Sequence, residues 1–393
     1  MRETCRMCGS KKLIEWLDLG HHPHSDQFKT SKDVEERTYP LKVCVCEDCG
    51  LNQLTFVVDK EELYTKDYLY ESSMTKTGDA HWEKFADVVL ETVRMPKRGL
   101  VVDAGSNDGT LLMKFQARGH DVLGIDPTPE VTEIARQRGI PTITDFFCKK
   151  AIEGKKADLI IGTNVFAHID DLNDFMTNVK ELLTDDGTFI FESPYFGDFL
   201  EGLEYDTVYH QHLSYLSLKP IVMFLEKFGM EVFDVNRVAI HGGSFRVYIS
   251  RKGNYEVKPV VKEILESENW GMEGLKRFSE DTMKNREDLF DLVYNLHKDG
   301  KTIAVVSTPA KGQTLLNYTG IGRFIDFATD KSKLKQGRFT PGTFITIYPD
   351  DELIRRQPDY ALLLAWNFAP EIIKNNVGFK GKWIIPVPKV KVI

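Results

Sequence analysis

Short apolar runs alternate with amphipathic segments in two separate regions of the chain. In the first region, the apolar run 99–103 predicts a buried parallel strand, and residues 110–118 carry their apolar side chains on one face of a helix. The run 122–125 predicts the next strand. Further strands are expected at 142–147, at 157–164, and at 189–192 after a turn at 185–188. This order of strand, helix and strand is typical of a parallel sheet covered by helices.

The second region of this kind lies in the last third of the chain. Residues 301–306 predict a strand, and the small residues of 307–314 predict a loop that opens a helix. Further strands are expected at 323–327, 360–364 and 383–385. Residues 255–298 are charged and have a helical period, which predicts a helix joining the two regions. The expected fold class is therefore α/β with two Rossmann-like sheets.

Length, charge and hydropathy narrow the class of protein. The chain has 393 residues, enough for two or three domains, with 42% hydrophobic and 28% charged residues. Its net charge of −8 argues against non-specific binding of nucleic acid. Membrane spans need runs of about 20 apolar residues, and the sequence has none. The first residues lack the apolar core of a signal peptide, so we expect a soluble, cytoplasmic protein.

Most of the cysteines gather near the N-terminus. Cys5 and Cys8 form one C-x-x-C pair, Cys46 and Cys49 form a second, and a glycine follows each pair. Two such pairs can hold Zn²⁺ tetrahedrally with no open coordination position, which makes the expected site structural. Cys44 could replace Cys46, and buried reduced cysteines without metal are the alternative to a zinc site.

Three histidines follow the first cysteine pair. His21, His22 and His24 flank Pro23. A second metal site is conceivable, but we favour a surface turn around the proline.

A glycine-containing loop follows the first predicted strand of the central region. It reads D-x-G-x-N-x-G, with Asp103, Gly105, Asn107 and Gly109. Asp126 follows Gly105 by about 20 residues, where nucleotide-binding α/β domains place an acid that accepts hydrogen bonds from ribose hydroxyls. The dinucleotide pattern G-x-G-x-x-G is absent. The loop resembles the S-adenosylmethionine loop of class I methyltransferases; a plain structural turn is the alternative.

Four further residues are candidates for contacts with that cofactor. Asp145 and Phe146 end the third predicted strand and suit the edge and the face of an adenine. Asn164 and His168 follow the fourth strand, at the edge of the sheet where ligands bind. Helix-capping or surface roles are the alternative for Asn164 and His168.

The segment after the fifth strand contains the sequence Tyr209-His210-Gln211-His212. In a strand or extended loop, residues i and i+2 face the same side, so both histidines are expected to point into one cleft. An imidazole with a pKa near 6.5 suits a general base at neutral pH. A pair of structural, hydrogen-bonded histidines is the alternative.

Landmarks along essentially the whole chain resemble the sugar C-methyltransferases of deoxysugar biosynthesis. They are the two cysteine pairs, YLYESS, VVDAGSNDG, ESPYF, YDTVYHQHLSYLS, HGGSFRVY, TPAKGQTLLNY, FTPGTF and PDYALLLAWNF. The resemblance implies a zinc-binding domain over residues 1–70, a methyltransferase domain over 71–250 and a Rossmann-like domain over 251–393. The first and third of these would help to enclose a sugar nucleotide.

The resemblance also implies a reaction. A methyl group passes from S-adenosylmethionine to a ring carbon, C-3, beside the ketone of a nucleotide-linked 4-keto-deoxysugar. His212 would remove the α-proton, with His210 in reserve, and Tyr209 and Gln211 would steady the enolate oxygen. The family commonly reads YHEH, whereas this chain has Gln211, whose amide cannot take a proton. It also has Phe344 where the family tends to carry a histidine.

Contacts with the sugar nucleotide are expected from the landmark segments. In the C-terminal region, the loop 307–314 would receive the pyrophosphate at a helix N-terminus beside Lys311; an ordinary strand–helix connection is the alternative. The expected substrate-binding residues are Tyr70, Ser72, Ser73, His241, Arg246, Lys311, Asn317, Trp366 and Asn367.

Three other functions compete with this one. An epimerase or isomerase would form the same enolate and reprotonate it. A binding protein would hold S-adenosylmethionine without chemistry. A nucleic-acid methyltransferase with a zinc ribbon is disfavoured by the net charge. We expect a monomer that binds neither nucleic acid nor membrane.

Overall fold

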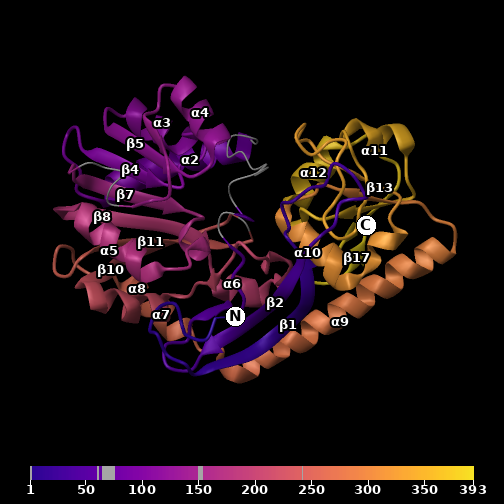
Figure 1. The fold of residues 1–393 in the computed structure, drawn as a ribbon, viewed down its shortest axis with the longest axis horizontal. Coiled ribbons are helices and arrows are strands. Elements are labelled where there is room, and N and C mark those ends of the chain that lie inside the picture. The colour runs from indigo at the N-terminus through magenta and orange to yellow at the C-terminus, as the bar shows by residue number, and fades with distance from the viewer. Residues whose placement is uncertain (1, 60–61, 64–75, 149–153, 241) are drawn as a thin grey trace.

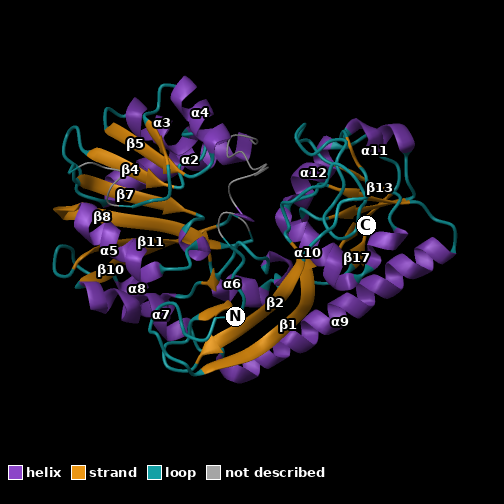
Figure 2. Cartoon of the chain, in the orientation of Figure 1, coloured by secondary structure: helices purple, strands orange, loops and turns teal. Residues whose placement is uncertain are grey.

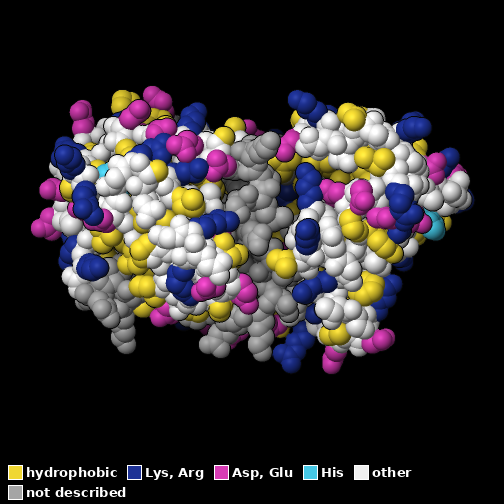
Figure 3. All heavy atoms as spheres, turned by 90° about the horizontal axis from the view of Figure 1, so that it is seen from above, with side chains coloured by type: hydrophobic (Ala, Val, Ile, Leu, Met, Phe, Trp, Pro, Cys, Tyr) yellow, Lys and Arg dark blue, Asp and Glu magenta, His cyan; other side chains and the backbone are white. Residues whose placement is uncertain are grey.

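The computed structural model describes residues 2–59, 62–63, 76–148, 154–240 and 242–393. Within these ranges the chain forms three sheets, which are arranged as two lobes above a smaller N-terminal sheet (Figure 1). Each lobe has strands at its centre and helices outside them (Figure 2). Viewed from above, basic and acidic side chains are interspersed over both lobes (Figure 3).

The N-terminal sheet is antiparallel and contains one strand from much later in the chain. Its strands in spatial order are β1 (Leu13–Pro23), β2 (Thr38–Cys46), β3 (Asn52–Leu54) and β9 (Ser214–Tyr215). In β9, Tyr215 pairs with Asn52 and Ser214 pairs with Gln53. The segment that carries the predicted base is therefore anchored in this sheet two residues after His212.

The central sheet has seven strands. In spatial order they are β10 (Met230–Val238), β11 (Ser244–Arg251), β8 (Leu183–Pro194), β7 (Ala157–Thr163), β4 (Leu100–Ala104), β5 (Asp121–Asp126) and β6 (Thr142–Thr144). The five strands from β8 to β6 are parallel, and β11 is antiparallel to β8. The carboxyl ends of the parallel strands thus meet at one edge, where ligands of such sheets bind.

Helices cover both faces of this sheet. Residues of α2 (Lys76–Thr92), α3 (Thr110–Ala117) and α4 (Pro129–Gln137) pack on one face. Residues of α5 (Leu172–Leu182), α7 (Leu218–Leu225) and α8 (Pro259–Ser267) pack on the other. The short helix α6 (Phe196–Glu201) follows β8.

The predicted strands of the central region are present, with two differences. The third strand ends at Thr144, so Asp145 and Phe146 lie just beyond it. The predicted turn at 185–188 is instead part of β8, which begins at Leu183. Here the pairing with β7 jumps from Ala157–Leu183 to Leu159–Thr188, which marks a bulge.

The C-terminal sheet has six strands. In spatial order they are β14 (Ile347–Tyr348), β13 (Phe327–Thr329), β12 (Ile303–Val306), β15 (Tyr360–Leu363), β16 (Lys382–Ile385) and β17 (Lys391–Val392). All neighbours are parallel except β16 and β17. Residues of α10 (Ala310–Thr319) pack on one face, and residues of α11 (Asp351–Arg356) and α12 (Ala369–Asn375) pack on the other.

The strand predicted at 323–327 is wrong for most of its length. Residues Ile321–Phe324 form a 3-10 helix, and β13 begins only at Phe327. Phe324 packs edge-on against Phe290 and Tyr294 of the long helix α9 (Gly271–Lys298). The apolar residue in this stretch therefore faces a helix rather than following the alternation of a strand.

The helix predicted over 255–298 is divided into α8 and α9. The break contains Glu268, whose carboxylate accepts hydrogen bonds from the backbone N–H groups of Leu218 (2.6 Å) and Lys219 (2.8 Å). Glu268 thus caps the first turn of α7, which places the break where the chain crosses that helix. α9 then runs beneath the N-terminal sheet to the C-terminal lobe (Figure 1).

The N-terminal sheet shares a core with each lobe. Cys5, Met7 and Leu51 pack with residues of the central sheet, and Leu17 and Val43 pack with residues of the C-terminal sheet. None of the helices that the structure describes combines the length and the apolar character needed to cross a membrane.

Candidate active site

The four cysteines of the two C-x-x-C pairs lie together. Cys5 Sγ is 3.5 Å from Cys49 Sγ, Cys8 Sγ is 3.4 Å from Cys46 Sγ, and all four sulfurs lie within 4.8 Å of one another. Thiolates on tetrahedral Zn²⁺, with Zn–S bonds of about 2.3 Å, lie about 3.8 Å apart, so the arrangement fits the metal. Cys44 is outside the cluster, and burial raises its pKa to about 11, which favours the thiol.

The segment of the first C-x-x-C pair contacts the central lobe near Asn164 and His168, two of the residues predicted to bind the cofactor. Arg2 and Arg6 both contact the carboxylate of Asp170, at 2.6 and 3.2 Å. The side chain of Asn173 donates to the carbonyl of Arg6 at 3.2 Å. Because Asp170 lies two residues after His168, the folded knuckles support the segment that carries this histidine.

The histidines around Pro23 do not form a surface turn. They lie at the end of β1 and just beyond it, and His22 and His24 are buried, with 3% and 5% of their surface exposed. Burial lowers the pKa of His22 to about 4 and that of His24 to about 3. The predicted turn is wrong because this segment enters the interior. No second group with metal-ligand spacing occurs within the described ranges.

The predicted cofactor loop bends sharply after β4. Gly105 has φ +76, and a Cβ there would lie 2.3 Å from Cγ2 of Val165, so only glycine fits without a shift. Asn107 also adopts a left-handed conformation, with φ +48. Its N–H donates to Oδ2 of Asp126 at 3.0 Å, and the N–H of Thr128 donates to Oδ1 at 2.9 Å. The acid at the end of β5 thus fixes the loop.

Asp103 and Asp126 bring two buried carboxyl groups to this edge of the sheet. They are 2% and 7% exposed, and Oδ1 of Asp103 has no hydrogen-bond partner among the described residues. Burial raises the pKa of Asp103 well above its usual range, and the nearby Asp126 raises it further. Burial also raises the pKa of Asp126. Polar groups this deeply buried need partners, and a polar, cationic ligand would provide them.

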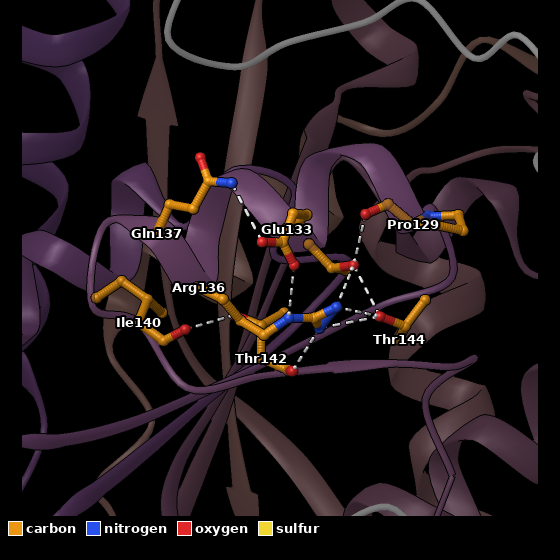
Figure 4. Close-up of polar contacts among 8 residues, drawn as sticks. Pro129, Glu133, Arg136, Gln137, Ile140, Thr142 and Thr144 are labelled. Atoms are coloured by element: carbon orange, nitrogen blue, oxygen red, sulfur yellow. Dashed lines mark hydrogen bonds and ion pairs between the residues drawn. The ribbon is translucent and has the colours of Figure 1, made fainter.

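The end of β6 is held by a cluster of polar contacts on α4 (Figure 4). Arg136 donates to the carbonyl of Thr142 at 3.1 Å and to the hydroxyl of Thr144 at 3.0 Å. The N–H of Asp145 then donates to the carbonyl of Asp126 at 3.1 Å. This places Asp145 beside the acid of the cofactor loop. Its side chain is exposed, and that of Phe146 is half-buried.

The segment after β7 connects the cofactor edge with the histidine region. Asn164 is left-handed, with φ +56, and its N–H donates to the carbonyl of Glu192 at 2.7 Å. His168 ends a 3-10 helix, and its ring centroid lies 5.1 Å from that of His212. Burial lowers the pKa of His168 to about 4, so its ring is neutral at neutral pH.

The two predicted catalytic histidines do not point into one cleft. The N–H of His212 donates to the carbonyl of Tyr209 at 2.9 Å, which makes these four residues a turn rather than an extended segment. The ring of His210 is directed toward Tyr39, 5.8 Å away, and 1% of the residue is exposed. Burial lowers its pKa to about 4, which makes it a poor proton acceptor.

His212 has a defined tautomer. Its Nδ1 lies 2.8 Å from the carbonyl of Thr207, which can only accept, so Nδ1 carries the hydrogen. Nε2 lies 2.6 Å from the hydroxyl of Tyr209, which donates to it. Neutral His212 therefore holds its lone pair on Nε2, beside a phenol. A small pocket next to this pair is lined by Thr207, Ser193, Tyr195 and Leu216 among others.

The turn that carries His212 is held by all three parts of the molecule. The N–H of Leu54 in β3 donates to the carbonyl of Leu213 at 3.0 Å. The hydroxyl of Thr314 in α10 donates to the carbonyl of Val208 at 2.8 Å. With His168 of the central lobe against the ring of His212, the predicted base lies where the three sheets meet.

A group of charged residues joins the C-terminal lobe to the same segment. Nζ of Lys311 lies 4.0 Å from the ring of Trp366, whose Nε1 donates to Asp206 at 2.6 Å. Burial lowers the pKa of Lys311, and the carboxylates of Asp206 and Glu204 oppose that shift. Burial and Asp206 raise the pKa of Glu204 to about 8. Lys311 and Trp366 thus lie together as candidate substrate contacts.

The other residues predicted to contact the substrate are bonded to the protein, buried, or outside the described residues. Arg246 is 4% exposed, and Nε and Nη2 of its guanidinium donate to Glu192 at 3.0 and 2.8 Å. Asn317 donates to the carbonyls of Gln313 and Pro341. Oδ1 of Asn367 is buried without a partner among the described residues. Tyr70, Ser72, Ser73 and His241 lie outside the described residues.

Two residues of this site, Asp206 and Asp26, were not predicted from the sequence. Asp206 belongs to the same motif as His212, and its charge could have marked it. Asp26 could not be found by spacing, because it lies 185 residues before Gln211, to whose amide it binds at 2.8 Å.

Family models match three successive segments of the chain. Residues 5–64 match "Putative zinc binding domain", residues 79–235 match "Methyltransferase domain" and residues 239–388 match "C-methyltransferase C-terminal domain". The predicted domain limits at 70 and 250 remain predictions.

A known protein is similar to this chain along its full length. The C-methyltransferase NovU of Streptomyces niveus is 34% identical over 409 residues, which cover 100% of this chain and 97% of that protein. Among solved structures, magnesium protoporphyrin IX methyltransferase of Synechocystis PCC 6803 is 16% identical, over 44% of this chain and 79% of its own, with a TM-score of 0.35. The PH0226 protein of Pyrococcus horikoshii OT3 is 16% identical over 47% of this chain and 95% of its own, with a TM-score of 0.39.

The central sheet and its cofactor loop define an S-adenosylmethionine-dependent methyltransferase of class I fold with an N-terminal zinc-binding domain. The full-length identity to NovU goes further, and the chain belongs to the C-methyltransferase family. This membership favours methyl transfer over the isomerase and the non-catalytic alternatives.

Proposed function

We propose that the protein methylates C-3, the ring carbon next to the ketone, of a nucleotide-linked 4-keto-deoxysugar. The observation that carries this proposal is the His212–Tyr209 pair at the meeting point of the three sheets. A carbon acid needs a base and a donor to the developing enolate oxygen, and this pair offers both. The resemblance to sugar C-methyltransferases supplies the substrate class.

The roles of the two side chains follow from their hydrogen bonds. In the free protein the Tyr209 hydroxyl donates to Nε2 of His212. When that hydroxyl turns to the ketone oxygen of the substrate, it releases the lone pair of Nε2. His212 then takes the α-proton, the electrons of the C–H bond pass to the ketone oxygen, and Tyr209 stabilises the enolate. The carbonyl of Thr207 at Nδ1 stabilises the imidazolium that results.

The cofactor-binding side of the site is the edge of the central sheet. When bound, S-adenosylmethionine would supply an electrophilic methyl group, whose bond to sulfur would break as the C–C bond forms. Asp126 would accept from the ribose, Asp103 would accept from the polar end of the cofactor, and Asp145 and Phe146 would contact the adenine. The ring of His168, which is neutral, lies tilted against that of His212 and would separate this side from the base.

The C-terminal lobe would bind the nucleotide of the substrate. Lys311 lies at the start of α10, where backbone N–H groups and the ammonium both favour an anion. Trp366 offers a ring beside it. We assign the pyrophosphate to Lys311 on this basis.

One experiment tests the reaction directly. The protein is incubated with S-adenosylmethionine labelled in its methyl group and with a panel of 4-keto-sugar nucleotides, and the products are analysed by mass spectrometry and by NMR of the sugar carbons. The expected product carries one label on the carbon beside the ketone. A label found on oxygen or nitrogen, or on no member of the panel, would overturn the proposal.

A further inference from the structure

One buried pair near the proposed base takes no part in the mechanism above. Nε2 of Gln211 donates to Oδ2 of Asp26 at 2.8 Å. Asp26 comes from the loop after β1, and Gln211 lies in the turn between Tyr209 and His212. The pair therefore connects the N-terminal sheet to the turn that carries the catalytic residues.

The contact with Asp26 decides how the Gln211 amide is oriented. A carboxylate only accepts hydrogen bonds, so the NH₂ group must face Asp26 and the carbonyl oxygen must face elsewhere. That oxygen, Oε1, is buried and has no hydrogen-bond partner among the described residues, and only 2% of Gln211 is exposed. A buried acceptor left unpaired destabilises the protein, and a partner present only in the complex would remove that cost.

The surroundings keep Asp26 able to accept. Burial raises the pKa of Asp26, and the Lys335 ammonium and the Gln211 amide oppose that shift. The neighbouring His24 and His210 are both neutral at neutral pH because burial lowers their pKa values to about 3 and 4. Above its raised pKa, Asp26 is thus a carboxylate that faces one lysine and one amide.

We propose that Asp26 is a positioning residue that fixes the Gln211 amide so that Oε1 accepts a hydrogen bond from a hydroxyl group of the substrate. The inference rests on the proposed function for the identity of that substrate. It changes the role expected for Gln211, because the atom left without a partner is an acceptor and cannot stabilise an enolate oxygen.

The test is a cycle of substitutions that exchanges the two groups. Gln211→Glu places two carboxylates at hydrogen-bond distance, so we expect KM for the sugar nucleotide to rise about 10-fold at neutral pH. Asp26→Asn removes the preference for one amide orientation, and a smaller rise of about 3-fold is expected. The double variant Asp26→Asn/Gln211→Glu should return KM to within about 3-fold of the wild type, because the amide introduced at position 26 then donates to a carboxylate that keeps an oxygen for the substrate.

Two readouts separate positioning from a merely structural role. In the wild type, KM should rise as pH falls through the raised pKa of Asp26, because the protonated carboxyl no longer selects the NH₂ group. Asp26→Asn should lose this acid limb. Calorimetry should give unchanged affinity for S-adenosylmethionine in all variants, and Asp33→Asn, an exposed acid of the same region, serves as the matched control. A double variant no better than Gln211→Glu, or a Gln211→Glu variant with wild-type KM, would overturn the inference.

A measurement without substrate distinguishes this failure from failure of the proposed function. NMR of protein labelled with ¹³C in the aspartate carboxyl groups follows the titration of Asp26. Gln211→Leu should raise its apparent pKa further, because the amide donor is lost. If the wild type methylates no sugar nucleotide but this shift is seen, the pair stands and the substrate is wrong. If methylation occurs and Gln211→Leu leaves the titration unchanged, the inference is wrong and the proposed function stands.

Discussion

The loop after β4 in the central sheet and the loop after β12 in the C-terminal sheet are built alike. In the first, the N–H of Gly105 donates to the carbonyl of Ile125 at 2.7 Å. In the second, the N–H of Ser307 donates to the carbonyl of Thr329 at 2.9 Å. Both residues are left-handed, with φ +76 and +66. Each loop therefore crosses to the neighbouring strand with the same backbone geometry.

An aspartate at the end of that neighbouring strand fixes each loop. Oδ2 of Asp126 accepts from the N–H of Asn107 at 3.0 Å, and Oδ2 of Asp330 accepts from the N–H of Thr308 at 2.8 Å. The other oxygen of each carboxylate accepts from the backbone N–H two residues later, at 2.9 Å in both cases. Because both carboxylates make these backbone hydrogen bonds without a ligand, the arrangement belongs to the fold.

The two aspartates differ in the other contacts that their carboxylates make. Asp330 also accepts from the hydroxyl of Thr308 at 2.6 Å and lies 3.8 Å from Nζ of Lys335. No ion pair joins Asp126 to a cation in the part of the chain that the structure describes. The proposed ribose contact would use the remaining acceptor capacity of Asp126, whereas Asp330 is paired with a lysine. The C-terminal loop instead presents a cation, Lys311, in agreement with the proposal of a cofactor in one lobe and an anion in the other.

Loss of the zinc is expected to have the largest effect on stability and activity, because the N-terminal sheet packs on both lobes and so supports both loops. A Cys5→Ser/Cys46→Ser double variant should lose its metal, melt at lower temperature and lack transferase activity, since metal binding and folding are coupled in such domains. Metal analysis should give close to one zinc per chain in the wild type and near none in the variant. Cys44→Ser is the control and should keep the metal. Release of zinc by Cys44→Ser but not by Cys46→Ser would show that the ligand set is wrong.

His212→Asn should have the next largest effect, because it removes the proposed general base, which lies outside both loops. Turnover should fall by about 10²–10⁴, and exchange of the substrate α-proton with deuterated water should fall with it. Affinity for S-adenosylmethionine should stay nearly unchanged, because the imidazole acts in the transition state. His21→Asn, at an exposed position, is the matched control. Exchange at the wild-type rate in His212→Asn would move the base to Tyr209 or elsewhere.

The features predicted well from sequence are those whose geometry is local. Cys5 and Cys8 are close because a C-x-x-C turn requires it, and Gly105 marks a tight bend whose close approach to Val165 leaves no room for a Cβ. The same locality explains why the five parallel strands of the central sheet were predicted, together with β12, β15 and β16 of the C-terminal sheet. The strands β10, β11, β14 and β17 and the 3-10 helix at Ile321–Phe324 were not predicted. The apolar Phe324 of that 3-10 helix packs on α9, a contact that no period along the sequence reveals.

The histidine turn shows where local patterns fail. The same-face rule for i and i+2 holds for extended backbone, and the bond from His212 N–H to the Tyr209 carbonyl replaces it with a turn. His210 then packs into the interior and His212 faces His168. The partner of Gln211 comes from a distant loop. Which face of an amide is offered to a ligand is therefore a tertiary property, and sequence spacing alone does not contain it.

Asp126→Ala and Asp330→Ala test whether the two loop-binding aspartates differ in their contribution to cofactor affinity. Loss of a charge-assisted hydrogen bond is worth roughly 1.5–3 kcal/mol, so Asp126→Ala should weaken binding of S-adenosylmethionine about 10- to 150-fold. Asp330→Ala should leave that affinity unchanged and lower only the melting temperature. Calorimetry and thermal unfolding measure both. Equal losses of cofactor affinity in the two variants would mean that both aspartates act through the fold alone.

The smallest effect is expected from Lys311→Met, which removes the cation of the C-terminal loop while keeping its length. Lys311 is flanked by Asp206 and Glu204, which offset part of its charge, so binding of the sugar nucleotide should weaken about 10-fold, the lower end for a charge-assisted contact. The loss should shrink as salt is added, because screening weakens the ammonium's attraction for phosphate. Affinity for S-adenosylmethionine should not change.

Lys331→Met, at an exposed position near the same sheet, is the matched control and should bind the sugar nucleotide like the wild type. Because the proposal assigns the pyrophosphate to Lys311, a nucleoside diphosphate without the sugar should show the same weakening, about 10-fold, in Lys311→Met. If the free nucleoside diphosphate binds equally to wild type and Lys311→Met while the intact sugar nucleotide does not, Lys311 recognises the sugar. The C-terminal loop would then differ from the loop after β4 in its ligand's chemistry and not only in its charge.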